Sequence, residues 1–234
     1  MLTLAVDTST ITASCAVAEN GRILSELNIQ YGKTHSQKII PMIKTVLKMI
    51  EKDFTDIDLY AASTGPGSFT GLRIGVVTVK AMAYAHNKPV CAVPTLDALA
   101  FSMPDFKGVI TPMMDARNNQ VYTALYKKEN NQLQKLIPET GIHIDEWIEE
   151  LINQNEDVLV LGDAAPLHLN RMQEILKDRL VSASSQLSFS RASAVALLAE
   201  QAYSDNKSMD AFDLTPFYLR KSQAERMQEL KSKI

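Results

Sequence analysis

The segment that decides the fold covers residues 62–75 and has the sequence ASTGPGSFTGLRIG. Its pattern predicts a buried strand, a glycine-rich turn and the first turn of a helix. Such a junction points backbone N–H groups and the positive end of a helix dipole outward, which suits an anion. Alternatively, the glycines serve tight turning and close contact between helix and sheet. The segment lacks the Gly-Lys-Ser/Thr of a Walker loop, and it is not the dinucleotide fingerprint that follows a first strand.

The first alternative defines a candidate anion or nucleotide site. An apolar run at residues 2–6 ends at Asp7, and a turn begins at Thr8. Together with the loop, these two residues complete the set expected near a bound anion, which is Asp7, Thr8, Gly65, Gly67, Ser68, Thr70, Gly71 and Arg73. A structural role for Asp7 is the other alternative, because an aspartate at a strand end commonly accepts hydrogen bonds from the N–H groups of the next turn.

The helix predicted after the loop, from Leu72 to about His86, is apolar on nearly all sides. Between residues 72 and 85 its only charged side chains are Arg73 and Lys80. A second helix, predicted at about residues 36–52, also has an apolar face wider than one packing contact requires. We therefore expect a subunit interface at Ile39, Met42, Ile43, Val46, Met49, Ile74, Val77, Val79 and Met82. The alternative is that both helices are enclosed within the fold.

Two halves of the chain share one order of predicted elements. Each begins with three strands, and then gives a helix, a strand, a glycine-containing loop and another helix. An acidic residue closes the first strand of each half, Asp7 in one and Asp115 in the other. This alternation predicts an α/β fold with mainly parallel sheets and an antiparallel hairpin at the edge. We expect an N-terminal lobe at residues 1–103, a C-terminal lobe at 104–220 and a basic tail at 221–234.

Composition excludes several classes of protein. The chain has 234 residues, a net charge of −3 and two cysteines, which we expect to be buried and reduced in a cytoplasmic protein. No basic leader and no apolar run of membrane-spanning length is present. The four histidines have no His-x-x-x-His spacing, so we expect no metal site. The basic tail fits a solvated terminus, or alternatively a contact with RNA or a partner.

Several motifs together resemble one family. These are LAVDTS at residues 4–9, HS at 35–36, GPGSFTGLRIG at 65–75, MDAR at 114–117 with VY at 121–122, and PFYLR at 216–220. They are similar to motifs of the TsaB (YeaZ) family, which takes part in tRNA threonylcarbamoyladenosine biosynthesis. The resemblance implies the duplicated ribonuclease-H-like fold of the sugar kinase, actin and heat-shock ATPase superfamily.

The resemblance also implies a function as a non-catalytic partner. Family members bind TsaD, a paralogue that modifies the adenosine next to the anticodon (A37), and TsaE joins them. The protein would then contact tRNA only through the complex, form a homodimer in isolation, and have no cofactor of its own, with ATP or ADP confined to the partner complex. One alternative is an ATPase or phosphotransferase using Asp7 and the loop at residues 65–71. A metal-dependent glycoprotease is the third hypothesis, although the sequence offers no ligand set for it.

Overall fold

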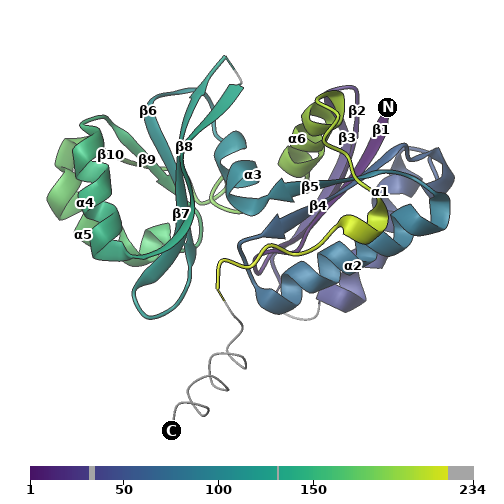
Figure 1. Cartoon of the computed structure of the whole chain (residues 1–234), viewed down its shortest axis with the longest axis horizontal. Coiled ribbons are helices and arrows are strands. Elements are labelled where there is room, and N and C mark those ends of the chain that lie inside the picture. Colours follow the sequence, from purple (N-terminus) through teal and green to yellow (C-terminus); the bar gives the residue numbers. More distant parts are fainter. Residues whose placement is uncertain (32–34, 131, 221–234) are drawn as a thin grey trace, which may run out of the picture.

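Two five-stranded sheets form the centres of two lobes (Figure 1). The computed structural model describes residues 1–31, 35–130 and 132–220, so the basic tail expected at 221–234 lies outside the described residues. The first half contains β1 (Leu2–Asp7), β2 (Ala13–Glu19), β3 (Arg22–Ile29), α1 (His35–Met49), η1 (Phe54–Asp56), β4 (Leu59–Gly65), α2 (Phe69–His86), β5 (Val90–Pro94) and α3 (Thr95–Phe101).

The second half repeats this order of elements. It contains β6 (Phe106–Asp115), β7 (Gln120–Glu129), β8 (Gln132–His143), α4 (Ile144–Gln154), β9 (Val158–Leu161), α5 (Ala165–Leu176), η2 (Lys177–Arg179), β10 (Leu180–Ser182), α6 (Ala192–Ser204) and η3 (Ala211–Asp213). The short strand β10 was absent from the sequence prediction, because three residues are too few to show a period.

The strand orders of the two sheets are equivalent. The first sheet has the order β3-β2-β1-β4-β5, and the second has β8-β7-β6-β9-β10. In each, the first three strands pair antiparallel and the other two pair parallel. This topology confirms the predicted duplicated ribonuclease-H-like α/β fold. The expectation of mainly parallel sheets is wrong, because two of the four strand pairings in each sheet are antiparallel. The β2–β3 turn also agrees with the sequence, since Asn20 and Gly21 both have the positive φ that such a tight hairpin needs.

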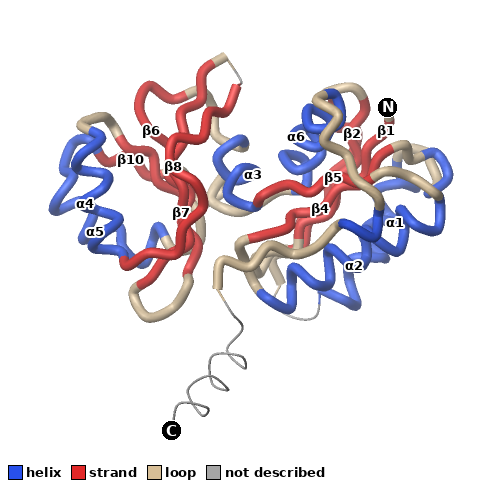
Figure 2. Tube along the Cα trace, viewed as in Figure 1, coloured by secondary structure: helices blue, strands red, loops and turns tan. Residues whose placement is uncertain are grey.

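Helices cover both faces of the first sheet (Figure 2). On one face, α1 and α2 pack on large apolar side chains such as Leu4, Val6 and Tyr60. On the other face, small side chains such as Ala5, Ala16 and Ala61 admit the alanine-rich helix α6. Burial of this apolar surface on both sides is the main favourable term holding the lobe together.

The path of α6 differs from the expected lobe boundary. The sequence prediction assigned residues 104–220 to the C-terminal lobe, but α6 packs on β1, β2, β4 and β5 of the first sheet. Residues after α6 also stay on the first lobe, where the Met209 and Val90 backbones exchange hydrogen bonds of 2.9 and 3.0 Å. The physical reason is that the elements of the first half leave the second face of the first sheet uncovered, and α6 buries this face.

Helix α3 lies between the lobes. Its Leu96, Leu99 and Ala100 join the core under the second sheet, whereas Ala98 and Phe101 join the core under the first. The buried Lys128 of β7 donates hydrogen bonds of 2.6 and 2.5 Å to the carbonyl oxygens of Phe101 and Met103 at the helix end. Pro94 occupies the cap position of α3 without a side-chain hydrogen bond.

Within the described residues, no helix is both long enough and apolar enough to cross a bilayer.

Candidate functional site

The glycine-rich segment packs directly on the turn that follows β1. The Thr8 hydroxyl donates a 2.7 Å hydrogen bond to the carbonyl oxygen of Gly71, and the Ser68 N–H donates a 2.7 Å bond to the carbonyl oxygen of Ser9. An added Cβ on Gly71 would stand 2.0 Å from the Thr8 carbonyl oxygen, and one on Gly67 would stand 2.5 Å from that of Ser9. These glycines are therefore required for close approach between the two segments.

The N-terminus of α2 is already capped by a side chain of the same chain. Ser68 is the N-cap residue, and its hydroxyl accepts a hydrogen bond of 3.2 Å from the Gly71 N–H. This bond satisfies one of the donors that a helix start leaves without an intrahelical partner. The arrangement favours the second of the two alternatives for the segment, in which the glycines serve turning and contact between helix and sheet.

Asp7 lies beneath this turn and is almost fully buried, with 1% of its surface exposed. Its Oδ1 accepts hydrogen bonds from the Ser9 N–H at 2.8 Å and the Ser9 hydroxyl at 2.6 Å. Its Oδ2 accepts bonds from the hydroxyls of Ser63, at 2.5 Å, and Ser190. The carboxylate thus ties β1 to β4 and to the residues preceding α6. This network supplies the structural role that sequence reasoning kept as an alternative for Asp7.

The C-terminal segment closes over the other side of the loop. Phe217 donates a 2.7 Å backbone hydrogen bond to the Thr64 carbonyl oxygen. Gly65 has φ 131°, and a Cβ there would stand 2.2 Å from the Phe217 carbonyl oxygen. Arg73 donates to the Tyr218 hydroxyl at 3.0 Å and lies 4.0 Å over the Phe69 ring. The exposed Thr70 lies in the first turn of α2.

A cavity of about 370 Å³ lies between residues of both halves. Its lining includes Thr10, Thr12 and Gln30 from the first half and Gly162, Asp163 and Ser188 from the second. None of the eight residues expected near an anion lines it, and among residues 1–31, 35–130 and 132–220 no Lys or Arg side chain does. The sequence-predicted residues therefore gather around an internal packing contact, separate from this cavity.

The nine residues expected at an interface differ in how much of each side chain is exposed. Five are buried in the first lobe and pack toward its sheet, so they have no side-chain surface for a partner; they are Ile39, Met42, Ile43, Val46 and Val79. Met82 is also mostly buried, and Ile74 is half-buried. Met49 and Val77 remain, with exposed fractions of 77% and 61%. For the buried positions, enclosure within the fold is the alternative that applies.

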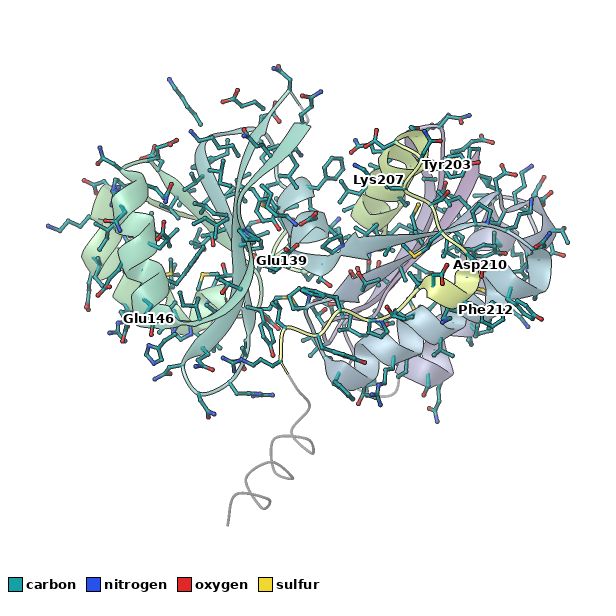
Figure 3. All side chains as sticks on the ribbon, viewed as in Figure 1. Glu139, Glu146, Tyr203, Lys207, Asp210 and Phe212 are labelled. Atoms are coloured by element: carbon teal, nitrogen blue, oxygen red, sulfur yellow. The ribbon has the colours of Figure 1, made fainter. Side chains whose placement is uncertain are left out.

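The outer face of α1 and α2 has further exposed apolar side chains that the sequence prediction missed. Ile40 on α1 and Tyr84 on α2 are exposed, and the Tyr84 ring packs edge-on against Phe212 of η3 at 4.9 Å. Figure 3 labels Phe212. Tyr84 lies seven residues after Val77, so the helical period itself was a signal for it. We call Ile40, Met49, Val77, Tyr84 and Phe212 the outer apolar face.

The charged side chains of α1 and α2 have one sign, whereas η3 places the acidic Asp210 and Asp213 on either side of Phe212. Neither α1 nor α2 contains an Asp or Glu. The helices carry five basic residues, which are Lys38, Lys44, Lys48, Arg73 and Lys80. A partner surface complementary to α1 and α2 would therefore be apolar where it meets Met49 and Val77, and acidic where it meets the lysines of these two helices.

Histidines and carboxylates in the described part of the chain do not form a cluster of three or more metal-ligating side chains. His35, at the start of α1, is half-buried and its Nε2 lies 2.9 Å from the Thr10 carbonyl oxygen.

Comparisons with known proteins give the family. A family model described as "TsaD: tRNA N6-adenosine threonylcarbamoyltransferase" matches residues 23–228. The tRNA threonylcarbamoyladenosine biosynthesis protein TsaB of Bacillus subtilis is 32% identical over 225 residues, which are 96% of each chain. The protein of the same name from Haemophilus influenzae is 28% identical, over 93% of this chain and 92% of that one.

Solved structures agree with these relatives. A Pseudomonas aeruginosa protein, described as uncharacterized with similarity to peptidase YEAZ, has a TM-score of 0.82 at 27% identity, over 94% of this chain and 99% of that one. A second structure, YeaZ from the same organism, has a TM-score of 0.77 at 26% identity, over 93% and 99% of the two chains. The chain belongs to the TsaB family, also called YeaZ, of tRNA threonylcarbamoyladenosine biosynthesis proteins.

Proposed function

We propose that this chain is a non-catalytic partner of TsaD in tRNA threonylcarbamoyladenosine biosynthesis. In this proposal it scaffolds TsaD, helps to recruit TsaE, and contributes to modification of the adenosine next to the anticodon in the cytoplasm. The exposed apolar side chains of α2 and η3 carry the proposal: Val77 and Tyr84 share one side of α2, and Tyr84 packs against Phe212. Exposed apolar patches of this kind commonly mark a protein interface. The chain needs no nucleotide of its own, and ATP or ADP is confined to the partner complex.

The residues around Asp7 support a structural role in place of catalysis. Each oxygen of the Asp7 carboxylate already accepts two hydrogen bonds from the chain, and the side chain has almost no exposed surface. A group that acts on a substrate must come within hydrogen-bonding reach of it. The ATPase alternative would require this network to open, whereas the scaffold needs it closed.

The outer apolar face also suits a homodimer in isolation, with one difference from the TsaD complex. Two copies meeting through this face would bring their lysines near one another, since both helices carry only basic charges. An acidic TsaD surface would relieve that repulsion. We therefore propose that the homodimer gives way to the TsaD complex, and that added salt strengthens the homodimer by screening.

The test is association of the purified chain with TsaD from the same organism, measured by titration calorimetry. Val77→Asp places a charge at the centre of the outer apolar face and should weaken association by about a hundredfold or more. Leu167→Asp is the matched control, because Leu167 on α5 is 64% exposed, against 61% for Val77. Unchanged association of Val77→Asp, or equal loss in both variants, would contradict the proposed interface.

A further inference from the structure

Three arginines lie in or next to the segment that follows η3 and reaches the second lobe. Arg73 of α2 donates to the Tyr218 hydroxyl at 3.0 Å. Two residues further on, Arg220 donates to the Ala116 carbonyl oxygen at 3.3 Å and also bonds the Gln120 side chain. Arg117 directly follows Ala116 in the β6–β7 turn. We call Arg73, Arg220 and Arg117 the arginine row.

The chain path makes this row continuous. Residues 214–220 run from η3 past α2 toward the second lobe (Figure 1). Tyr218, which accepts the hydrogen bond of Arg73, lies two positions before Arg220 in a stretch without regular secondary structure.

Aromatic rings hold two of the guanidinium groups. Arg73 lies 4.0 Å over the Phe69 ring, which stacks on Tyr218 at 4.5 Å. Arg220 lies 5.7 Å from the centre of the Tyr122 ring. A guanidinium group packed on a ring loses less freedom when it binds, and its planar N–H groups match a phosphate or carboxylate.

Arg117 is the most exposed member of the row. Its side chain is 86% exposed, and its only ion pair within the described part of the chain joins it to Asp115 at 3.4 Å. Arg117, Asn118 and Asn119 all have positive φ, at 66°, 54° and 55°. An arginine in this conformation is uncommon, and residues held in such regions cluster at functional sites.

The positive charge of the arginine row favours binding of a polyanion. Asp115 is the only carboxylate paired with any of the three arginines in the described residues. The sequence that continues from Arg220 has four basic residues and two glutamates, at positions 221–234. We propose that the arginine row binds the phosphate backbone of tRNA directly. This inference rests on the proposed function for the identity of the RNA, and it departs from the expectation that tRNA is contacted only through the partner.

The experiment measures binding of an unmodified tRNA transcript by fluorescence anisotropy across a range of salt concentrations. The full chain is measured alone and together with TsaD. The test variant is Arg73→Gln combined with Arg117→Ala, since both side chains are exposed and Arg220 is left to hold the lobes. Lys207→Ala is the control; Lys207 pairs with Asp205 just beyond α6, where Figure 3 labels it.

The double variant should bind tRNA about tenfold more weakly at low salt. Its plot of log affinity against log salt should lose roughly 0.7–0.9 of slope for each phosphate contact removed. The Lys207→Ala protein should match the unsubstituted chain in both respects. Equal affinity and slope in the double variant and the control would overturn the inference, and so would a chain that binds no tRNA either alone or with TsaD.

Two further outcomes separate this inference from the proposed function. The double variant could fail to bind TsaD and yet, measured without TsaD, bind tRNA as tightly as the unsubstituted chain. The arginine row would then contact protein, and the inference would be overturned. If the unsubstituted chain does not bind TsaD, the proposed function fails. In that case the tRNA affinity of the chain alone still decides the inference.

Discussion

The Thr8 hydroxyl donates a 2.7 Å hydrogen bond to the carbonyl oxygen of Gly71, a residue 63 positions further along the chain. The bond fixes the first turn of α2 on the end of β1. It leaves no room for a side chain at Gly71, since a Cβ would stand 2.0 Å from the Thr8 carbonyl oxygen. The position of α2, and with it the outer apolar face, therefore depends on this contact.

Gly71→Ala should destabilise the protein by about 2–3 kcal/mol, because the new methyl group meets backbone atoms that cannot move aside cheaply. The measurement is urea unfolding followed by circular dichroism. Gly141→Ala is the control, since the nearest atoms to its Cβ are 3.4 Å away, and it should change stability by less than about 0.5 kcal/mol. Equal stability of the two variants would show that the segments are not in close contact.

Substitutions of Asp7 should separate charge from hydrogen bonding. Asp7→Ala leaves four donors without their acceptor and should cost about 3 kcal/mol. Asp7→Asn keeps one acceptor oxygen and should cost about 1 kcal/mol. Thermal unfolding of both variants checks the order. An Asp7→Ala protein as stable as the unsubstituted chain would contradict the network.

Lys128 should be important for stability although it is a lysine. It is 4% exposed, and burial lowers the pKa of its ammonium group, while nearby Asp105 opposes that shift. Lys128→Met keeps the volume but leaves the carbonyl oxygens of Phe101 and Met103 unpaired, so we expect a loss of about 2 kcal/mol. Lys207→Met, at an exposed position, should have almost no effect in the same unfolding assay.

The two cysteines should be unreactive in the folded protein. Burial raises the pKa of Cys15 to about 12, helped by the charge of Glu26, and burial raises the pKa of Cys91 to about 11. Both values exceed the ordinary 9.0, so the unfolded chain loses its thiol protons first as pH rises. The thiols should therefore stabilise the fold fully below about pH 9 and lose that contribution toward pH 11–12.

Thiol titration with Ellman's reagent checks the cysteine prediction. At pH 8 both thiols should react only after denaturant is added, and the free energy of unfolding should fall between pH 9 and pH 11. Fast reaction of either thiol in the native protein would show that its surroundings are open to solvent.

The sequence was informative where a signal repeats along the chain. Strand runs, the Asn20-Gly21 turn and the period of α1 and α2 were enough for the order of elements and the duplicated fold, because each reports on neighbours within a few residues. The same period could not tell which apolar positions face the sheet. Ile39 and Val79 are buried in the lobe, whereas Val77, two residues before Val79, is exposed.

Sequence patterns could not predict contacts between residues that lie far apart in the chain. The Ser190 hydroxyl donates a hydrogen bond to Asp7, which lies 183 positions earlier in the chain. No pattern in the sequence around either residue predicts this contact. For the same reason the return of α6 to the first lobe was missed, since alanine-rich helices pack equally well on any sheet with small side chains. Helix α6 packs on the first sheet because the alanines of β1, β2 and β4 form a surface of small side chains there. Only the folded sheet brings these alanines together.

The most direct test of the central claim is tRNA threonylcarbamoylation by purified TsaD and TsaE, with and without this chain. We expect modification to require the chain, to survive Asp7→Asn, and to be lost with Val77→Asp but not with Leu167→Asp. If folded Asp7→Asn protein still binds TsaD but abolishes modification, or if Val77→Asp supports full modification, the account of a non-catalytic scaffold acting through the outer apolar face is wrong.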